Sequence, residues 1–243
     1  MLSVVVPAYN EGKTIKDNLL KICEVIGQEF DDYEVIPVND GSKDNTHEQI
    51  MIAVSDVASC GKIHPVSYEV NRGKGGAIKA GVAAAKGDYI GFLDADLDIS
   101  ADHIVRYYKA ILDEKCDVII GSKMHKESKL KYPFARKLFS WCYFVMLKVL
   151  FGLSVLDTQT GVKLYRGNLI KEISPKQRVD GFAFDIEVLA LASSMGATIK
   201  QMPVNIVFTR NESFGRIKVS DVWKMFTDTW KIWWNLKIRR NYK

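Results

Sequence analysis

The first half of the chain alternates short apolar runs with longer stretches in which apolar residues recur every three or four positions. The short runs predict β-strands near residues 2–6, 33–38, 64–68, 89–93 and 117–121. The longer stretches predict helices near 14–28, 44–58, 75–86 and 101–114. Repeated strand–helix–strand units place their strands parallel in one sheet and their helices on both faces. We therefore expect an α/β fold with a mostly parallel, Rossmann-like sheet flanked by helices.

The second half is less regular and indicates a second lobe that continues the first. Residues 138–156 are almost continuously apolar, with Lys148 as the one charge, and predict a helix. Further elements are expected as a strand near 161–165, a helix near 184–195, a strand near 198–208 and a terminal helix. The basic, proline-containing stretch 123–136 is the nearest approach to a boundary. We divide the chain into lobes at 1–122 and 123–218, which form one domain, and a tail at 219–243.

Unusual residues follow four of the predicted strands. Parallel sheets bind ligands in the crevice beyond the carboxyl ends of their strands. The four segments found there begin at Pro7, Asn39, Asn71 and Asp94. We expect these segments to converge on one site.

The segment after the 89–93 strand carries Asp94, Asp96 and Asp98 in alternate positions. Mg²⁺ and Mn²⁺ take oxygen ligands and are commonly shared between one or two carboxylates and substrate phosphates. Aspartates also collect in turns and at helix starts, so Asp98 could simply cap the next helix. The position after a parallel strand favours the metal site.

Glycines from Gly73 onward lie at the predicted start of a helix but match neither of two common nucleotide motifs. Ile78 stands where the third glycine of G-x-G-x-x-G belongs, and no G-K-[ST] follows a phosphate-binding loop. A helix start flanked by Arg72 and Lys74 remains a reasonable anion site, while helix capping alone would also explain the glycines. At the neighbouring turn, Asp40 could accept hydrogen bonds from a base or ribose, or serve only the turn.

The tail combines positive charge with tryptophan. Residues 218–243 contain seven basic and two acidic side chains, whereas the net charge of the whole chain is +5. Four of the five tryptophans lie in the same stretch. On a helix, Lys224, Lys231 and Arg239 share one face and Phe226 and Trp230 another. This composition is typical of a helix lying in a membrane interface, although a terminal helix docked on its own domain fits as well.

Together with the 138–156 run, the tail favours two helices that lie in or on one leaflet without crossing it. The four cysteines are scattered without a C-x-x-C pair, and the N-terminus runs from Met1 straight into an apolar strand without the pattern of a secretory leader. We expect a cytoplasmic protein, peripheral on the cytoplasmic face of a membrane. Nucleic-acid binding has little support because the basic excess is confined to the tail. A homo-oligomer is compatible with the sequence.

Taken in order, the motifs resemble those of inverting family-2 glycosyltransferases with the GT-A fold. The segments concerned are Val6-Pro7-Ala8-Tyr9-Asn10-Glu11, Asn39-Asp40-Gly41-Ser42, Arg72-Gly73-Lys74-Gly75-Gly76-Ala77 and Asp94-Ala95-Asp96. Two later segments, Asp157 to Lys163 and Phe184-Asp185-Ile186-Glu187, narrow the resemblance to polyprenyl-phosphate mannose and glucose synthases. The resemblance covers roughly residues 2–218.

The resemblance implies a transfer of a hexose from a nucleotide sugar, of the UDP-glucose or GDP-mannose type, to a polyprenyl phosphate. The 1–122 lobe would bind the donor and the 123–218 lobe the acceptor. Implied donor contacts are Pro7, Ala8, Tyr9, Glu11, Asp40, Lys74 and Asp94. Asp94, Asp96 and Asp98 would hold Mg²⁺ or Mn²⁺, with Asp96 essential for catalysis. Catalytic cations would be Lys123, Arg136 and Arg210, and Arg136 and Ser140 would meet the acceptor phosphate. The segment after Arg210 departs from the family pattern, which leaves Ser213 and Lys218 without a secure role.

Two alternatives compete with this interpretation. A family-2 enzyme that uses a glycan hydroxyl as acceptor would need a carboxylate base, for which Asp185 is the best candidate and Glu187 the second. A non-enzymatic protein that binds a nucleotide sugar at a membrane is the other, and the intact Asp94 and Asp96 pair argues against it.

Overall fold

The computed structural model describes residues 1–128, 134–181, 183–206 and 219–242. Within these ranges it describes the side chains of all residues except 134–142 and 219–222. Within these ranges seven strands form one sheet in the order β3-β2-β1-β4-β6-β5-β7. The strands are β1 (Leu2–Ala8), β2 (Tyr33–Asp40), β3 (Val66–Tyr68), β4 (Tyr89–Phe92), β5 (Val118–Ser122), β6 (Lys163–Arg166) and β7 (Ile199–Pro203). The first four are mutually parallel, and β5 and β7 pair in parallel, whereas β6 runs antiparallel to both β4 and β5. The expectation of a mostly parallel α/β sheet is confirmed.

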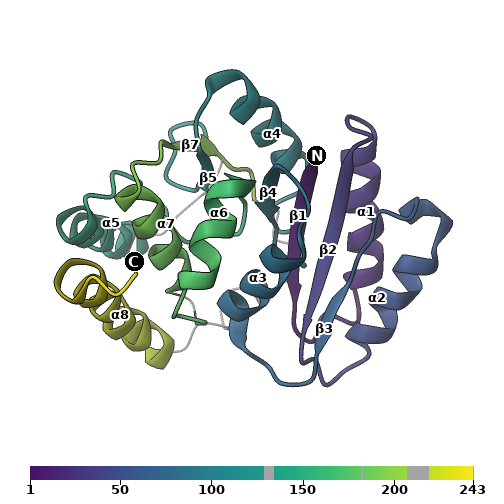
Figure 1. Cartoon of the computed structure of the whole chain (residues 1–243), viewed down its shortest axis with the longest axis horizontal. Helices are drawn as coiled ribbons and strands as arrows, with labels where there is room; N and C mark the ends of the chain where they lie inside the picture. Colours follow the sequence, from purple (N-terminus) through teal and green to yellow (C-terminus); the bar gives the residue numbers. More distant parts are fainter. Residues whose placement is uncertain (129–133, 182, 207–218, 243) are drawn as a thin grey trace.

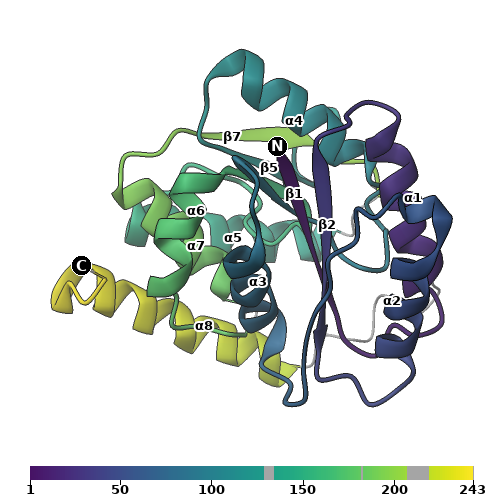
Figure 2. The ribbon, with the colours of Figure 1, turned by 45° about the vertical axis from the view of Figure 1, so that its right-hand side comes forward.

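Helices cover both faces of this sheet (Figures 1 and 2). The α-helices are α1 (Ile15–Gly27), α2 (Thr46–Ser55), α3 (Gly73–Ala84), α4 (Asp102–Glu114), α5 (Phe134–Phe151), α6 (Gly167–Ile173), α7 (Phe184–Ser194) and α8 (Val219–Trp233). Two 3₁₀ turns, η1 (Val57–Ser59) and η2 (Ser174–Lys176), and a π-helical turn, η3 (Trp234–Arg239), complete the elements. Helices α5, α7 and α8 gather at the end of the molecule opposite α1 and α2 (Figure 1).

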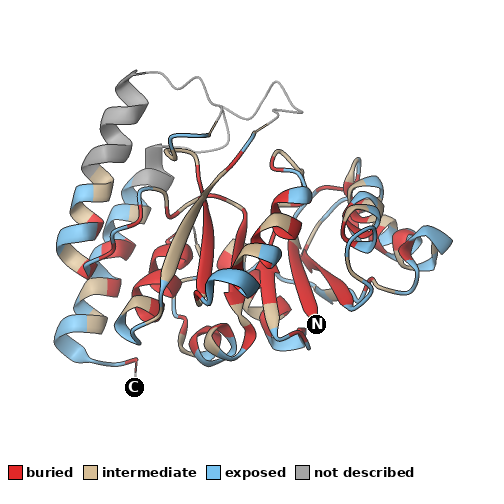
Figure 3. Cartoon of the chain, turned by 90° about the horizontal axis from the view of Figure 1, so that it is seen from above, coloured by how far each residue is buried: buried red, intermediate tan, exposed pale blue. Residues whose placement is uncertain are grey.

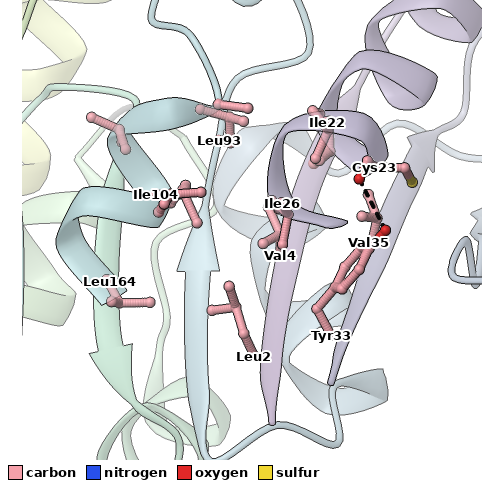
Figure 4. Close-up of a cluster of buried hydrophobic side chains, with 14 of the residues drawn as sticks. Leu2, Val4, Ile22, Cys23, Ile26, Tyr33, Val35, Leu93, Ile104 and Leu164 are labelled. Carbon is pink, nitrogen blue, oxygen red and sulfur yellow. Dashed lines mark hydrogen bonds between the residues drawn. The ribbon is translucent and has the colours of Figure 1, made fainter. Parts of the chain in front are cut away.

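Alternation along the strands builds two apolar cores, one on each face of the sheet. In β1, Val4 and Val6 join the core under α1, α2 and α4, while Val5 points to the core under α3, α6 and α7. Figure 4 shows part of the first core, where the Tyr33 hydroxyl donates to the carbonyl of Cys23 on α1 at 3.0 Å. The inner strands are red over most of their length in Figure 3, as expected for a sheet covered on both faces, whereas the edge strand β7 is tan because its residues are only partly buried. Because helices and apolar side chains cover both faces of the sheet, the ends of the strands are where a ligand-binding site can form.

Several boundaries differ from expectation for local reasons. Helix α5 spans 134–151 instead of 138–156, because Gly152 follows with φ +72°, the left-handed conformation that ends helices. The last strand is shorter than expected and ends at Pro203, which has no N–H to donate. Helix α6 has seven residues, too few to show a helical period, and the sequence pattern did not predict it. The predicted strand near 161–165 forms as β6 but lies between β4 and β5.

The tail forms a helix that has one face on the protein and another exposed. Ile232 is fully buried, and Met225 and Leu236 pack against the same core. Trp223, Trp230 and Trp234 are 72%, 52% and 49% exposed. The expectation of a terminal helix docked on its own domain therefore describes the tail, which also presents aromatic side chains to the outside. Contact of this face with a membrane stays a prediction. Within the described residues no helix is long and apolar enough to cross a membrane.

Candidate functional site

The loops after β1 and β2 are held together by polar contacts. The N–H of Asn10 donates to the Ser42 hydroxyl at 3.0 Å, and the Asn10 side chain accepts from the Lys43 N–H at 2.9 Å. The N–H of Glu11 donates to the Thr46 hydroxyl at 2.8 Å. Asn10 has φ +56°, a left-handed conformation that asparagine tolerates better than most residues. These contacts fix the backbone of the segment that begins at Pro7. In this segment Pro7 and Ala8 still belong to β1, and the side chain of Tyr9 is 44% exposed.

Asp40 ties the end of β2 to the loop after β3. Its carboxylate accepts from the Tyr68 hydroxyl at 2.7 Å, the Asn71 side-chain amide at 2.9 Å and the Arg72 N–H at 2.7 Å. The Arg72 guanidinium lies over the Tyr68 ring at 4.4 Å. Asp40 is only 3% exposed, and these donors from β3 and the loop after it surround its carboxylate. The carboxylate therefore organises the loop that carries Arg72. The neighbouring Gly41 has φ +64°, and a Cβ at this position would clash with the backbone nitrogen of Asn71 in the same loop.

Lys74 connects the glycine-rich start of α3 with the acidic loop after β4. Its ammonium group forms an ion pair with Oδ1 of Asp94, and the two side chains are 29% and 41% exposed. Burial acts to raise the pKa of Asp94, but the ammonium groups of Lys74, Lys163 and Lys123 outweigh it and lower that pKa below its usual value. Asp94 is therefore ionised at neutral pH.

The acidic loop lies at the mouth of a small pocket. A space of about 120 Å³ is lined by Asp94, Asp96, Asp98, Ile99, Lys123, Gln159, Gly161 and Ile206. Burial raises the pKa of Asp96, and the nearby carboxylates of Asp94 and Asp98 raise it further. Crowded carboxylates of this kind are relieved by a cation. Gly161 lines the pocket directly against Asp94, since a Cβ there would lie 1.9 Å from Oδ2 of Asp94.

The donor set fits a hard divalent cation that is shared with a ligand. In the described ranges no three or more His, Cys, Asp or Glu side chains are grouped so that they could hold a metal ion. Mg²⁺ bound to a diphosphate needs only one or two protein carboxylates, because phosphate oxygens and water complete its shell. Asp94 and Asp96, two carboxylates at one strand end beside the pocket, match that requirement.

A buried ion pair lies behind the acidic loop. The Lys163 ammonium, on β6, lies 2.7 Å from Oδ1 of Asp185 at the start of α7 and 2.6 Å from the carbonyl of Thr160. Burial raises the pKa of Asp185, while the ammonium groups of Lys163 and Lys74 oppose that rise. Asp94, Lys74, Asp185 and Lys163 thus form a cluster of alternating charge. Sequence reasoning assigned Lys163 no role, although it is the one charged residue in the predicted strand near 161–165, and that was its signal.

Glu187, two residues after Asp185 on α7, is fully buried, and its carboxylate is hydrogen-bonded. Its carboxylate accepts from the N–H groups of Arg178 and Val179 and from the Tyr242 hydroxyl. Its contacts therefore join segments of the protein around the site.

Five candidate positions cannot be placed by their side chains. Arg136 and Ser140 lie on α5, and their side chains fall outside the described residues, as do Arg210, Ser213 and Lys218. Of the other candidates, Lys123 lines the pocket beside the aspartates, and its N–H donates to Asp157 at 3.0 Å. The structure thus brings together Lys74, Asp94, Asp96, Asp98, Lys123 and Asp185. Asp40 lies outside this group, at the end of β2, where it accepts from the N–H of Arg72 just before α3.

Known proteins are similar in sequence to most of this chain. The model of the family "Glycosyl transferase family 2" matches residues 3–174. A dolichyl-phosphate beta-glucosyltransferase of Trichomonas vaginalis is 34% identical over an alignment of 243 positions, which covers 95% of this chain and 72% of that protein. The enzymes of the same name from Dictyostelium discoideum and Homo sapiens are 30% and 31% identical over 84% of this chain, which spans 65% and 66% of their length.

Solved structures of other glycosyl-transferring enzymes have the same fold as this chain. Glucosyl-3-phosphoglycerate synthase from Mycobacterium tuberculosis, in complex with uridine diphosphate, superposes with a TM-score of 0.68 at 20% identity over 97% of this chain and 79% of that chain. A complex of that synthase with Mn²⁺, UDP-glucose and phosphoglyceric acid gives a TM-score of 0.66 over 97% of this chain and 79% of that chain. At this identity the likeness establishes the GT-A fold.

Proposed function

Since the chain belongs to glycosyltransferase family 2, we propose that it transfers a hexose, glucose as in its named relatives, from a nucleotide sugar to a polyprenyl phosphate. The observation that carries the proposal is the arrangement at the end of β4, where two carboxylates meet the cations Lys74 and Lys123 beside a pocket. A nucleotide sugar needs such a site, because its diphosphate leaves with negative charge that must be neutralised.

In this proposal the chain's own residues bind and orient the donor. The loops after β1, β2 and β3 would hold the nucleoside, with Tyr9 exposed toward it and Asp40 keeping the Arg72 loop in place. Asp94 and Asp96 would hold Mg²⁺ or Mn²⁺, which would supply charge neutralisation at the departing diphosphate. Lys74 and Lys123 add positive charge beside it.

The acceptor in this proposal needs no strong base. A phosphate monoester has its second pKa near ~6, so its oxygen is largely ionised at neutral pH. Catalysis then rests on alignment of that oxygen with the anomeric carbon of the sugar. The phosphate oxygen forms the new bond to carbon while the bond to the leaving diphosphate breaks, which inverts the anomeric centre. Arg136, Ser140 and Arg210 remain proposed acceptor and diphosphate contacts.

The exposed aromatic face of α8 supports action at a membrane surface. Trp223 and Trp230 of α8 and Trp234 at the start of η3 are exposed, and Lys224 and Lys231 lie next to them in the sequence. Tryptophan beside basic residues suits the boundary between headgroups and lipid tails. We place the protein on the cytoplasmic face of a membrane, where it would meet a lipid-linked acceptor.

The test is a transfer assay with the full chain, a short polyprenyl phosphate, and UDP-glucose or GDP-mannose in the presence of Mn²⁺ or Mg²⁺, with products read by mass. We expect one hexosyl polyprenyl phosphate from one of the donors, and loss of about 100-fold or more in Asp96→Ala. No product with either donor, or full activity of Asp96→Ala with a chelator present, would contradict the proposal.

A further inference from the structure

Glu187 is a buried carboxylate whose partners come from two segments far apart in the sequence. It lies on α7 with 0% exposure. Its oxygens accept from the Arg178 N–H at 3.1 and 3.0 Å and from the Val179 N–H at 2.8 Å. The Tyr242 hydroxyl, at the end of the tail, donates to Oε1 at 2.5 Å. One side chain therefore fixes a loop and the tail at the same point.

A second set of contacts joins the same loop and tail. The Arg178 side chain donates to the carbonyl of Asn241 at 2.9 Å, and its guanidinium lies 5.4 Å from the centre of the Tyr242 ring. A cavity of about 420 Å³ lies beside this junction and is lined by the loop on one side and α8 on the other. The Tyr242 ring is buried in the apolar core on this face, and the polar contacts of Tyr242 and Arg178 join that packed ring to the loop.

The loop in turn supports the glycine-rich start of α3. The N–H of Gly75 donates to the carbonyl of Asp180 at 2.9 Å, and the Gln177 amide donates to the carbonyl of Gly75 at 3.0 Å. A Cβ on Gly73 or Gly75 would lie 2.7 to 2.8 Å from backbone or side-chain atoms of this loop or the adjoining α7. Residues 177–180, named here the support loop, therefore lie directly against the turn that carries Lys74.

Lys74 ends this chain of contacts at the candidate site, through its ion pair with Asp94. The sequence of contacts runs from Tyr242 to Glu187, from Glu187 to the support loop, and from there to the glycine turn and Lys74. Helix α8 and the π-helical turn η3, which lead to Tyr242, are the elements that expose Trp223, Trp230 and Trp234.

We infer that Glu187 is a positioning residue through which docking of the tail end, Asn241 and Tyr242, sets the glycine turn for binding of the donor diphosphate. This inference rests on the proposed function. Its consequence is that a tail held on a lipid surface keeps the support loop in place, whereas a displaced tail weakens donor binding. A tail that served stability alone would leave donor binding unchanged.

The experiment compares two tyrosine-to-phenylalanine variants of the full chain. Tyr242→Phe removes the hydroxyl that bonds Glu187 and keeps the ring beside Arg178. Tyr143→Phe is the matched control, because the Tyr143 hydroxyl joins α5 to Thr229 of α8 at 3.0 Å without touching the support loop. Binding of UDP-glucose and of GDP-mannose with Mn²⁺ is measured by calorimetry without acceptor, and KM and kcat are measured with polyprenyl phosphate.

We expect Tyr242→Phe to weaken donor binding and raise the donor KM about fivefold or more, with a smaller change in kcat, and Tyr143→Phe to stay within about twofold of the unchanged chain. Amide hydrogen exchange is the second readout, and Tyr242→Phe should accelerate exchange in both residues 73–76 and the support loop. A lowered unfolding midpoint with unchanged donor affinity and unchanged exchange in 73–76 would overturn the inference. If the unchanged chain binds neither nucleotide sugar, the proposed function fails, and the exchange experiment still decides whether Tyr242 controls the glycine turn.

Discussion

The ammonium nitrogen of Lys163 lies 2.7 Å from Oδ1 of Asp185, and the two side chains are 2% and 6% exposed. A carboxylate that is paired in this way balances a buried cation, and breaking such a pair leaves an uncompensated charge. We predict that Asp185→Asn lowers the free energy of unfolding by about 3–5 kcal/mol. The double variant Lys163→Met, Asp185→Leu should be closer to the unchanged chain in urea unfolding.

The same Asp185→Asn variant separates the two acceptor classes. With a polyprenyl phosphate acceptor no proton has to be removed, so the remaining folded protein should retain transfer. A hydroxyl acceptor requires a base, and its turnover should then fall about 100-fold or more. Turnover lost only with a sugar acceptor would favour the rival function, with Asp185 as its base.

Lys74 should set the acidic limit of activity. Its ammonium group lowers the pKa of Asp94, so Lys74→Met should allow that pKa to rise. The ionised form of Asp94, which is the form that binds a cation, would then be lost at a higher pH than in the unchanged chain. We predict that the acidic limb of the pH profile of transfer shifts upward in Lys74→Met and much less in Lys74→Arg, which keeps the charge. An unshifted limb in Lys74→Met would show that Asp94 does not depend on this lysine.

Gly161 should be required at the pocket for reasons of space. A Cβ at this position would lie 1.9 Å from Oδ2 of Asp94, so Gly161→Ala must displace that carboxylate or the loop. We predict that transfer and Mn²⁺-dependent donor binding fall about tenfold or more, since misplacement of a catalytic group by 1 Å can cost as much as 100-fold. Gly181→Ala is the control, because a Cβ at Gly181 meets no atom within 4 Å. Equal activity of the two variants would contradict the close approach.

Asp117 should stabilise the far edge of the sheet in a pH-dependent way. Its carboxylate accepts from the N–H and hydroxyl of Thr198 at 2.9 and 2.8 Å and pairs with Arg166 at 3.1 Å. Burial acts to raise the pKa of Asp117, but the hydrogen bonds from Thr198 and the charge of Arg166 lower it overall. Because the folded pKa is the lower one, the stabilisation is present above the unfolded value near ~3.9 and is lost as the pH falls through the folded value.

We therefore predict that Asp117→Asn lowers the free energy of unfolding by about 1–2 kcal/mol at pH ~7, and that the difference shrinks as the pH falls below ~4. Urea unfolding across this range measures it. Asp113→Asn, an exposed change on α4, should stay within about 0.5 kcal/mol throughout. A difference that is constant with pH would rule out the titration of Asp117 as its cause.

The exposed tryptophans of α8 and η3 should govern binding to lipid. We predict that replacing Trp230 and Trp234 by serine reduces flotation of the chain with anionic liposomes by about tenfold, because each buried aromatic side chain contributes apolar area to the interface. Val57→Ser changes a side chain that is 92% exposed near η1 and should leave flotation unchanged. Equal flotation of the double tryptophan variant and the unchanged chain would exclude this face as the site of contact with the membrane.

The local pattern of the sequence was sufficient for the sheet and for the loops at its edge. Periodicity placed β1, β2 and β4 within one or two residues, and the position of parallel strand ends then brought Asp94, Lys74 and Asp40 to one edge. The pairing of β6 was beyond that reasoning, since an alternating run looks the same whether it pairs parallel or antiparallel. Lys163 and Asp185 meet only because of that pairing and the position of α7.

The role of Glu187 was equally hidden. Its partners, Arg178 and Tyr242, lie 9 and 55 residues away, and a hydrogen bond of that separation leaves no periodic signal. The sequence indicated a carboxylate near the site, and either a base or a structural role fitted it. Contacts made across the fold, in this case with the tail, were needed to distinguish between these roles.

The position of β6 between β4 and β5 has a consequence for synthesis of the chain. When residues 1–122 have left the ribosome, β4 and β5 exist, but the strand that joins them has not been made. The nascent protein therefore carries an unpaired strand edge beside its acidic loop until residues 163–166 emerge. Such edges are templates for wrong pairing between chains, so a fragment that ends at residue 122 should aggregate more readily than the whole chain.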